Sequence, residues 1–216
     1  DPGLPAAPQR IADGVWVFEG ARAHFSRDNG GNIVNTGFIE TAEGVVVIDP
    51  GPSLRYGQAQ REAIRKATGK DVVRVYVTHA HPDHFLGAIA YDGVPVLALE
   101  KTAAAIRDDG EELAANLYLL VGGAMAGTRP VPVQAIDRVG EEVVGGRRLR
   151  LLALDGHTDA DLALLDERSG VLFAGDLAFL DRAPTTPNAD IDHCWPHSTR
   201  CRSCASRCWC QDTGRS

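Results

Sequence analysis

A heptapeptide dense in metal-binding side chains follows directly after a predicted buried strand. The heptapeptide is Thr78-His79-Ala80-His81-Pro82-Asp83-His84, and the strand is predicted over residues 71–77, where apolar and β-branched residues alternate with others. Three imidazoles and a carboxylate thus lie on the loop leaving a strand, which is where open α/β sheets usually bind their ligands. The sequence therefore predicts an α/β fold with a ligand site at one edge of its sheet.

The spacing within this heptapeptide fits metal coordination. Side chains two residues apart in extended backbone point the same way, so His79 and His81 can coordinate one ion from the same side. Pro82 then changes the direction of the chain, which lets Asp83 and His84 face a second point a few ångströms away. Imidazole and carboxylate are ligands that zinc takes at about 2.0–2.2 Å. The alternative is a polar surface loop that is rich in histidine by chance.

A His-x-His-x-Asp-His motif after a strand resembles the signature of the metallo-β-lactamase superfamily, and the resemblance extends from about Ile11 to His193. It implies a four-layer αββα sandwich that holds metal ions at one edge, between its two sheets. We therefore expect one metallo-β-lactamase-like domain over residues 11–193. An aberrant, cysteine-rich and disordered tail is expected over residues 194–216.

Two later motifs resemble further metal-binding landmarks of the family. Asp155-Gly156-His157 follows a strand predicted over residues 148–154, and Gly175-Asp176 follows a hairpin predicted over residues 162–174. The resemblance implies that His157 completes three imidazoles around the first metal, and that Asp176 is shared by both metals. The implied metal ligands are therefore His79, His81, Asp83, His84, His157 and Asp176.

Together these landmarks imply a dinuclear zinc hydrolase. Two zinc ions would share a water, lower its pKa towards neutrality and so hold a metal-bound hydroxide at working pH. Asp83 would orient this hydroxide as the catalytic residue, and the substrate would be a small molecule with an ester, thioester, lactone or amide bond. Aspartate at position 176 is more similar to thioesterase, lactonase and general hydrolase members than to several true β-lactamases.

Two other functions stay open on the sequence alone. A mononuclear iron dioxygenase that acts on sulfur compounds uses a similar motif on the same fold. A non-catalytic or inactive binding protein is the third alternative, because the chain departs from the family pattern at its end.

The apolar run over residues 45–48 predicts a central buried strand, and it ends in Asp49. A carboxylate at the end of a buried strand needs a partner. In the family, this aspartate resembles a group that supports the metal site by fixing the orientation of a ligand histidine. The other interpretation is a turn aspartate that caps its own backbone.

Periodicity predicts the remaining elements of the body. A strand is expected over residues 32–39, and an amphipathic helix over residues 56–68 ends at Gly69. Residues 85–90 predict a short helix. Residues 100–122 predict a longer one, broken near Asp108-Asp109-Gly110.

Composition limits the classes of partner. With 216 residues, of which 44% are hydrophobic, the chain can bury one sizeable core. Its formal net charge of −7 is opposite to the basic charge that is typical of nucleic-acid-binding proteins. No apolar run reaches the roughly 18 residues that a membrane span needs.

A narrower resemblance is carried by residues 28–39 and by Gly175-Asp176-Leu177-Ala178-Phe179. Both segments are similar to zinc metallohydrolases assigned to quinoprotein relay systems. This resemblance implies a periplasmic protein associated with a quinoprotein dehydrogenase or with sulfur oxidation. A cytoplasmic location is the alternative.

Residues 194–216 do not fit the family. All five cysteines of the chain lie here, no hydrophobic period is present, and the C-terminal Gly-His that binds the second metal in the family is missing. One interpretation is a metal-binding or disulfide-forming cluster, because the cysteines are spaced loosely like ligands. That cluster would consist of Cys201, Cys204, Cys208 and Cys210.

The genetic code offers another interpretation of this tail. Read two bases later, Cys then Trp (TGY TGG) contains the leucine codon YTG, and Trp then Pro contains the alanine codon GCC. Codon choices allow the whole tail to be translated in this shifted frame as Leu-Ala-Ser-Leu-Asp-Ala-Leu-Pro-Gln-Leu-Arg-Ile-Glu-Val-Leu-Val-Pro-Gly-His-Gly-Pro-Val. That segment has an amphipathic helix, a buried strand and the missing Gly-His-Gly.

We therefore expect that a single-base deletion near codon 194 produced the tail. The chain as written would then lack its native last helix and strand, and its second metal site would keep only Asp83, His84 and Asp176. His193 or His197 could substitute for the missing ligand, but nothing in the sequence places them.

Overall fold

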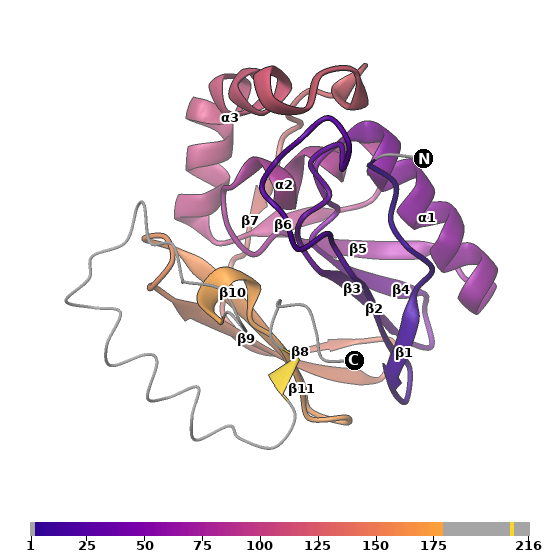
Figure 1. Cartoon of the computed structure of the whole chain (residues 1–216). Coiled ribbons are helices and arrows are strands. Elements are labelled where there is room, and N and C mark those ends of the chain that lie inside the picture. Colours follow the sequence, from indigo (N-terminus) through magenta and orange to yellow (C-terminus); the bar gives the residue numbers. More distant parts are fainter. Residues whose placement is uncertain (1–2, 179–207, 210–216) are drawn as a thin grey trace.

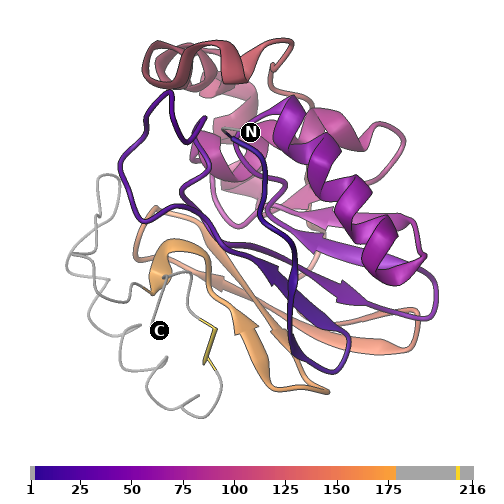
Figure 2. The same ribbon diagram turned by 45° about the vertical axis from the view of Figure 1, so that its right-hand side comes forward.

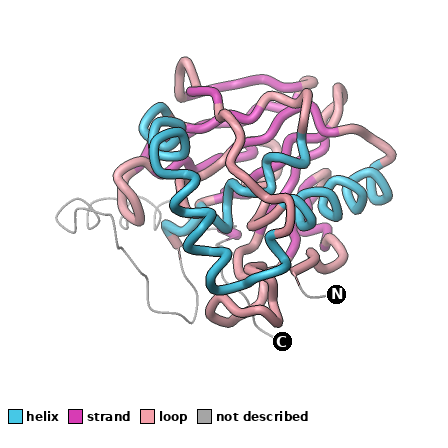
Figure 3. Tube along the Cα trace, turned by 90° about the horizontal axis from the view of Figure 1, so that it is seen from above, coloured by secondary structure: helices cyan, strands magenta, loops and turns pink. Residues whose placement is uncertain are grey.

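Two β-sheets stacked face to face form the body of the protein, and helices cover the outer face of the first sheet (Figure 1). The structure, a computed structural model, describes residues 3–178 and 208–209. A view turned by 45° shows the α-helices of this described part on one side of both sheets (Figure 2). Seen from above, the helices lie nearest the viewer, over the strands (Figure 3).

The strand order is β1-β2-β3-β4-β5-β6-β7 in the first sheet and β12-β11-β10-β9-β8 in the second. The first sheet consists of β1 (Gln9–Ala12), β2 (Val15–Phe18), β3 (Thr36–Glu40), β4 (Val45–Ile48), β5 (Val72–Tyr76), β6 (Val96–Ala98) and β7 (Gln134–Ala135). The second sheet consists of β8 (Gly140–Val144), β9 (Arg147–Leu154), β10 (Asp161–Asp166), β11 (Val171–Phe173) and β12 (Cys208–Trp209). The α-helices are α1 (Leu54–Thr68), α2 (Pro82–Phe85) and α3 (Glu100–Val121), and the 3-10 helices are η1 (Leu86–Tyr91), η2 (Gly122–Met125) and η3 (Gly175–Leu177).

Three parallel pairs in the first sheet determine where its functional loops lie. These pairs are β4–β5, β5–β6 and β6–β7. Parallel neighbours need a crossover connection, and here α1, then α2 with η1, then α3 supply the three crossovers. Because parallel strands end at the same edge, the segments that leave β4 and β5 emerge beside each other at that edge.

Two apolar clusters hold the layers together. One lies between the first sheet and the helices, where Phe38 and Val75 meet Ile64 and Ile106. The other lies between the two sheets. Its members include Val46, Ile48, Leu149, Leu162 and Phe173. Alternating side chains of β4 thus serve both clusters, which explains why this strand is apolar throughout.

Helix α1 has well-defined ends. Ser53 accepts a hydrogen bond from the backbone N–H of Tyr56 at 3.1 Å, and Gly69 ends the helix with φ 70°. The predicted helix over residues 56–68 is therefore confirmed, and it begins two residues earlier, at Leu54.

The predicted break in the long helix is wrong. α3 runs without interruption through Gly110, which is buried in the helix. A Cβ at Gly110 would lie 3.1 Å from the Cβ of Pro130, so the absent side chain lets the helix approach that proline closely. Gly110 is thus a packing residue and not a helix break.

The predicted strand over residues 32–39 starts too early, because β3 begins at Thr36. Asn35 accepts a hydrogen bond from the Gly20 N–H at 2.9 Å, and Asn32 donates one to the carbonyl of Leu4 at 3.0 Å. The side chains of Asn32 and Asn35 thus hydrogen-bond to backbone groups and stabilise irregular structure before β3. Asparagine often forms such bonds, which is why it favours turns over strands.

The layered α/β sandwich expected from the sequence is confirmed. Within residues 3–178, no α-helix lies over the outer face of the second sheet, where Ala163, Leu172 and Ala174 form a small apolar cluster with half-buried leucines, including Leu177 of η3. The two-residue strand β12 pairs in parallel with β11 at the edge of the second sheet. His193 at the end of the predicted domain lies outside the described residues, as does the remainder of the predicted tail, which includes His197 and three of the four proposed cluster cysteines.

A buried ion pair joins β9 to β10 at the end of the sandwich away from the histidines. Two guanidinium nitrogens of Arg147 donate to the two carboxylate oxygens of Asp166, each at 2.7 Å. Both side chains are at least 96% buried, and Arg147 also donates to the Asp13 carbonyl at 2.8 Å. The Ser169 hydroxyl and N–H donate to the same carboxylate. The pair therefore fixes the hairpin turn and the N-terminal turn together.

Replacing Gly87 with alanine should destabilise the fold. A Cβ at this position would lie 2.0 Å from the carbonyl oxygen of Pro50, in the turn that follows β4. Because backbone has to move to relieve this overlap, we expect a loss of about 1–3 kcal/mol in the free energy of unfolding, measured by urea denaturation. Gly123→Ala is the matched control, since a Cβ there would have nothing within 4 Å. Equal stabilities of the two variants would contradict this packing.

Candidate metal centre

The loop that follows β5 brings two histidines to the edge between the sheets. His79 is fully buried and His81 is half-buried. Pro82 begins α2, a position that suits proline because its missing N–H would have no helical partner. The chain therefore turns after His81, as the sequence indicated, and Asp83 and His84 lie in the first turn of the helix. Both are buried.

His157 reaches the same place from the second sheet, and Asp161 holds its loop. The Asp161 carboxylate accepts hydrogen bonds from the N–H groups of His157 and Thr158, each at 2.9 Å, and from the Thr158 hydroxyl at 2.8 Å. Sequence reasoning missed this positioning residue. An aspartate a few residues after the Gly-His pair is the available signal, because aspartate commonly bonds nearby backbone in turns.

Asp176 is brought to the cluster by Gly175. Gly175 has φ 54°, and a Cβ there would lie 2.9 Å from the hydroxyl oxygen of Thr78. Only glycine allows both this backbone conformation and this close approach. The Leu162 N–H also donates to the Thr78 carbonyl at 2.8 Å, which ties the second sheet directly to the histidine loop.

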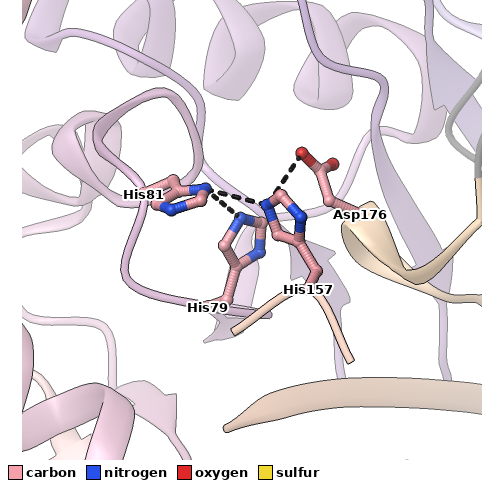
Figure 4. A group of neighbouring side chains, drawn as sticks. All are labelled: His79, His81, His157 and Asp176. Atoms are coloured by element: carbon pink, nitrogen blue, oxygen red, sulfur yellow. Dashed lines mark hydrogen bonds and ion pairs between the residues drawn. The ribbon is translucent and has the colours of Figure 1, made fainter. Parts of the chain in front are cut away.

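Three imidazole nitrogens meet at one point (Figure 4). Nδ1 of His81 lies 3.0 Å from Nε2 of His79 and 2.9 Å from Nε2 of His157. Asp176 Oδ2 lies 3.4 Å from His157 Nε2, and the four ligand atoms are all within 4.8 Å of one another. Ligands about 2.0–2.1 Å from a tetrahedral zinc would be about 3.3 Å apart, so the spacing is close to what one ion requires.

A second candidate metal position lies on the other side of Asp176. Asp176 Oδ1 is 3.4 Å from Nε2 of His84, so its two oxygens face two different histidines. The His84 Nε2 atom is buried and has no hydrogen bond within the described part of the chain. Buried polar atoms are nearly always paired, so this nitrogen also fits a metal ligand. His84 and Asp83 do not belong to the four-residue group around the first point.

Asp49 lies behind the second point. Its carboxylate accepts hydrogen bonds from the Thr78 N–H at 2.8 Å and the Thr78 hydroxyl at 2.9 Å, and it contacts His84 Nδ1 at 2.8 Å. Asp49 is fully buried and has φ 59°, so a left-handed backbone aims the carboxylate at this loop. The contact with His84 supports the interpretation of Asp49 as a group that orients a histidine.

The electrostatics of the cluster favour a bound cation. Burial alone would lower the pKa of His84, but three nearby carboxylates raise that pKa well above its ordinary value. They belong to Asp176, Asp49 and Asp83. Burial raises the pKa of Asp83 to about 6, and burial lowers the pKa of His79 well below its ordinary value. The carboxylates that stabilise a positive charge on His84 would also stabilise a metal cation here, and binding of that cation would release the imidazole proton.

A cavity of about 410 Å³ opens beside His81. It is lined by one face of α3 and by the loop after His157. Lys101, Asp109, Leu113 and Thr158 are among its lining residues.

Replacing Asp161 with alanine should weaken metal binding without touching a ligand. The change removes three hydrogen bonds that hold the His157 loop, and loss of such supporting groups commonly lowers metal affinity about 10–100-fold. Competition with a chelator measures the affinity. Asp159→Ala is the control, because Asp159 is an exposed residue of the same loop. An unchanged metal affinity in Asp161→Ala would show that Asp161 does not support the metal site.

Comparisons with known proteins agree with this architecture. The family model described as the metallo-beta-lactamase superfamily matches residues 29–201. The chain is similar to the metallo-beta-lactamase from Pontibacter korlensis, with 21% identity and a TM-score of 0.72, covering 93% of this chain and 86% of that chain. No curated protein sequence matches this chain significantly.

Two further solved structures have the same fold. The metallo-beta-lactamase FIM-1 from Pseudomonas aeruginosa in its mono-zinc form is 16% identical, with a TM-score of 0.69 over 99% of this chain and 89% of that chain. The metallo-beta-lactamase from Hirschia baltica is 16% identical, with a TM-score of 0.66 over 97% of this chain and 91% of that chain. At these identities the similarity shows the fold alone.

Proposed function

Because this chain belongs to the metallo-β-lactamase superfamily, we propose that it is a zinc-dependent hydrolase of a small molecule with an ester, thioester, lactone or amide bond. One observation carries the proposal. The ligand atoms of His79, His81, His157 and Asp176 converge from two sheets on one point. A fold alone would not require this, since unrelated functions share folds.

The candidate ligands are divided between two metal positions. His79, His81 and His157 would hold the first ion, and Asp176 would be shared with a second ion held by Asp83 and His84. When bound, zinc supplies a water of lowered pKa and polarises the substrate carbonyl. Figure 4 shows how closely the first four side chains approach one another.

Asp83 is our candidate for the catalytic carboxylate. It is buried beside His84 at the start of α2, and burial raises its pKa to about 6. Asp83 would orient the reacting hydroxide, while the carboxylate of Asp49 keeps the neighbouring His84 ring in place.

The cavity beside His81 is our candidate for the substrate pocket. Leu113 offers it an apolar surface, and Lys101 and Asp109 offer charged groups. This combination suits a small polar molecule. The relatives of known structure are described as β-lactamases, but aspartate at position 176 favours thioester and lactone substrates over β-lactams.

We also propose that the protein works in the periplasm, in association with a quinoprotein dehydrogenase system. The support is the similarity of residues 28–39 and of the segment after Gly175 to quinoprotein relay hydrolases. No helix among the described residues is both long and apolar enough to span a membrane. Fractionation of cells that produce the protein, followed by co-purification, would test both statements.

A substrate panel tests the proposed activity. The purified chain, loaded with excess zinc, should hydrolyse at least one member of a set of thioesters, lactones and β-lactams. Removal of the metal by a chelator should abolish the reaction, and readdition of zinc should restore it. Failure on the whole set would favour a non-catalytic protein. Iron in the purified protein together with oxygen uptake would favour a dioxygenase instead.

A further inference from the structure

Gln60 lies at the centre of a buried hydrogen-bond network, and both N–H donors of its side chain are used. The residue belongs to α1 and is fully buried. Its Nε2 donates to Thr36 Oγ1 at 2.8 Å and to the backbone carbonyl of Asp49 at 3.1 Å, and its Oε1 accepts from the hydroxyl of Tyr91 at 2.5 Å. One side chain of α1 thus joins β3, the turn after β4 and the end of η1.

The Asp49 carbonyl determines which way this amide is turned. A carbonyl oxygen can only accept, so the nitrogen of the Gln60 side chain has to face it, and a rotated amide would place two acceptors against each other. On the other side, burial raises the pKa of Tyr91 well above its ordinary value, so the hydroxyl keeps the proton that it donates to the amide oxygen. The amide of Gln60 is therefore a donor towards Asp49.

The backbone of Asp49 needs such a donor. Asp49 has φ 59°, and no other residue except glycine has a positive φ in the described part of the chain. Left-handed backbone at such a residue costs free energy and persists only where its surroundings hold it. The Asp49 N–H donates to the Tyr76 carbonyl at 2.8 Å, and Gln60 binds the carbonyl of the same residue. Gln60 thus supplies one of the two backbone hydrogen bonds that hold this conformation.

Asp49 connects Gln60 to a histidine of each candidate metal position. The Asp49 carboxylate contacts His84 Nδ1 at 2.8 Å and accepts from the Thr78 hydroxyl at 2.9 Å. Thr78 Oγ1 in turn lies 3.0 Å from Nδ1 of His79. Both rings therefore direct Nδ1 at this network, which leaves their Nε2 atoms for a metal. A shift of the Asp49 backbone would turn both rings.

We propose that Gln60 is a positioning residue of the metal centre, because its bond to the Asp49 carbonyl holds the turn that aims the Asp49 carboxylate at His84 and Thr78. This inference rests on the metal centre of the proposed function. Loss of a partner that orients a ligand commonly lowers metal affinity about 10–100-fold. Gln60 is one hydrogen bond further from the ion than Asp49, so we expect an effect at the lower end of this range.

Gln60→Met tests the proposal, with Tyr91→Phe as the matched control. Methionine is similar in size to glutamine and suits a helix, but it cannot donate to Asp49. Phenylalanine removes the hydroxyl on the other side of the amide and leaves both donors of Gln60 in place. In chelator competition, zinc affinity should fall about tenfold in Gln60→Met and less than about twofold in Tyr91→Phe. Urea denaturation should show a loss of stability in both variants, because both break the same network.

A spectroscopic measurement on the metal-free protein separates positioning from stability. The proton on His84 Nδ1 faces the Asp49 carboxylate, so it should give a low-field NMR signal that is protected from exchange with water. This signal should persist in Tyr91→Phe, whereas in Gln60→Met it should shift or be lost through exchange.

The parent chain allows a further measurement that needs no variant. Addition of zinc should shift the side-chain amide resonances of Gln60, because Asp49 links this amide to the histidines. The resonances of Gln58, an exposed residue of the same helix, should stay in place.

Three results would overturn the inference: an unchanged zinc affinity in folded Gln60→Met, equal losses of affinity in Gln60→Met and Tyr91→Phe, or Gln60 amide resonances that do not move when zinc binds the parent chain. Zinc binding as expected without hydrolysis of any substrate would refute the proposed function and leave the role of Gln60 standing. If the parent chain binds no zinc, the proposed function fails, and the His84 signal of the metal-free variants still decides whether Gln60 orients this ring.

Discussion

Replacing His81 with alanine should lower the zinc affinity of the first site more than about 100-fold. Loss of a group that merely supports a ligand costs about 10–100-fold, and loss of the ligand itself should cost more. His81 is the informative choice because its Nδ1 lies within 3.0 Å of both His79 Nε2 and His157 Nε2. Its side chain is half-buried, so its removal leaves a smaller defect than removal of the fully buried His79. Chelator competition would measure the affinity.

His24→Ala is the matched control for this experiment. His24 lies on the exposed loop before β3, and it is not part of the group of residues that converges on the first point. The control should bind zinc like the parent chain, and any hydrolysis measured for the parent should persist. Tight zinc binding by His81→Ala, equal to that of His24→Ala, would remove His81 from the metal centre.

Replacing Arg147 with methionine should produce the largest loss of stability, about 3–5 kcal/mol at pH 7. The change leaves the carboxylate of Asp166 buried without its guanidinium partner, and breaking such a pair on one side has this typical cost. Urea denaturation measures the loss. In the double variant Arg147→Met/Asp166→Asn the unpaired charge is gone and the amide still accepts from Ser169, so we expect a smaller loss.

The pH dependence gives an independent check of this pair. Burial alone would raise the pKa of Asp166, but hydrogen bonds from Arg147 and Ser169 outweigh burial and hold that pKa below its ordinary value. The pair therefore stabilises the fold fully above the unfolded pKa of about 3.9, and its contribution is lost as pH falls through the folded pKa. Without Arg147, burial should raise the pKa, so the deficit of Arg147→Met should shrink as pH falls from 7 to about 4. A deficit that does not depend on pH would contradict this assignment.

The sequence predicted well the features that depend on neighbouring residues. The strand before His79, the helix that ends at Gly69 and the hairpin after His157 follow from local periodicity and capping, and the structure confirms them. The histidine motif also marked one edge of the sheet correctly. Each of these patterns lies within a short stretch of chain, where residue spacing and side-chain direction are directly linked.

The features that depend on distant contacts could not be predicted in this way. Gly110 looked like a helix break, because the sequence does not show that Pro130 packs against it. The sequence singled out Gly175 only as the residue before Asp176 and did not single out Asp161. In the structure, Gly175 allows the close approach to Thr78, and Asp161 holds the His157 loop. The ligand roles of the six proposed site residues stay a prediction that metal analysis can test.

The candidate ligands are divided between the two halves of the sandwich, and this has a consequence for cooperativity. His79 and His81 follow β5, whereas His157 and Asp176 follow strands of the other sheet. An ion bound by both halves acts as a removable cross-link, worth about 4 kcal/mol when free metal exceeds its dissociation constant about 1,000-fold. Withdrawal of the ion should therefore let the halves open separately, and backbone amides near the junction should exchange with deuterium before the rest of the molecule unfolds.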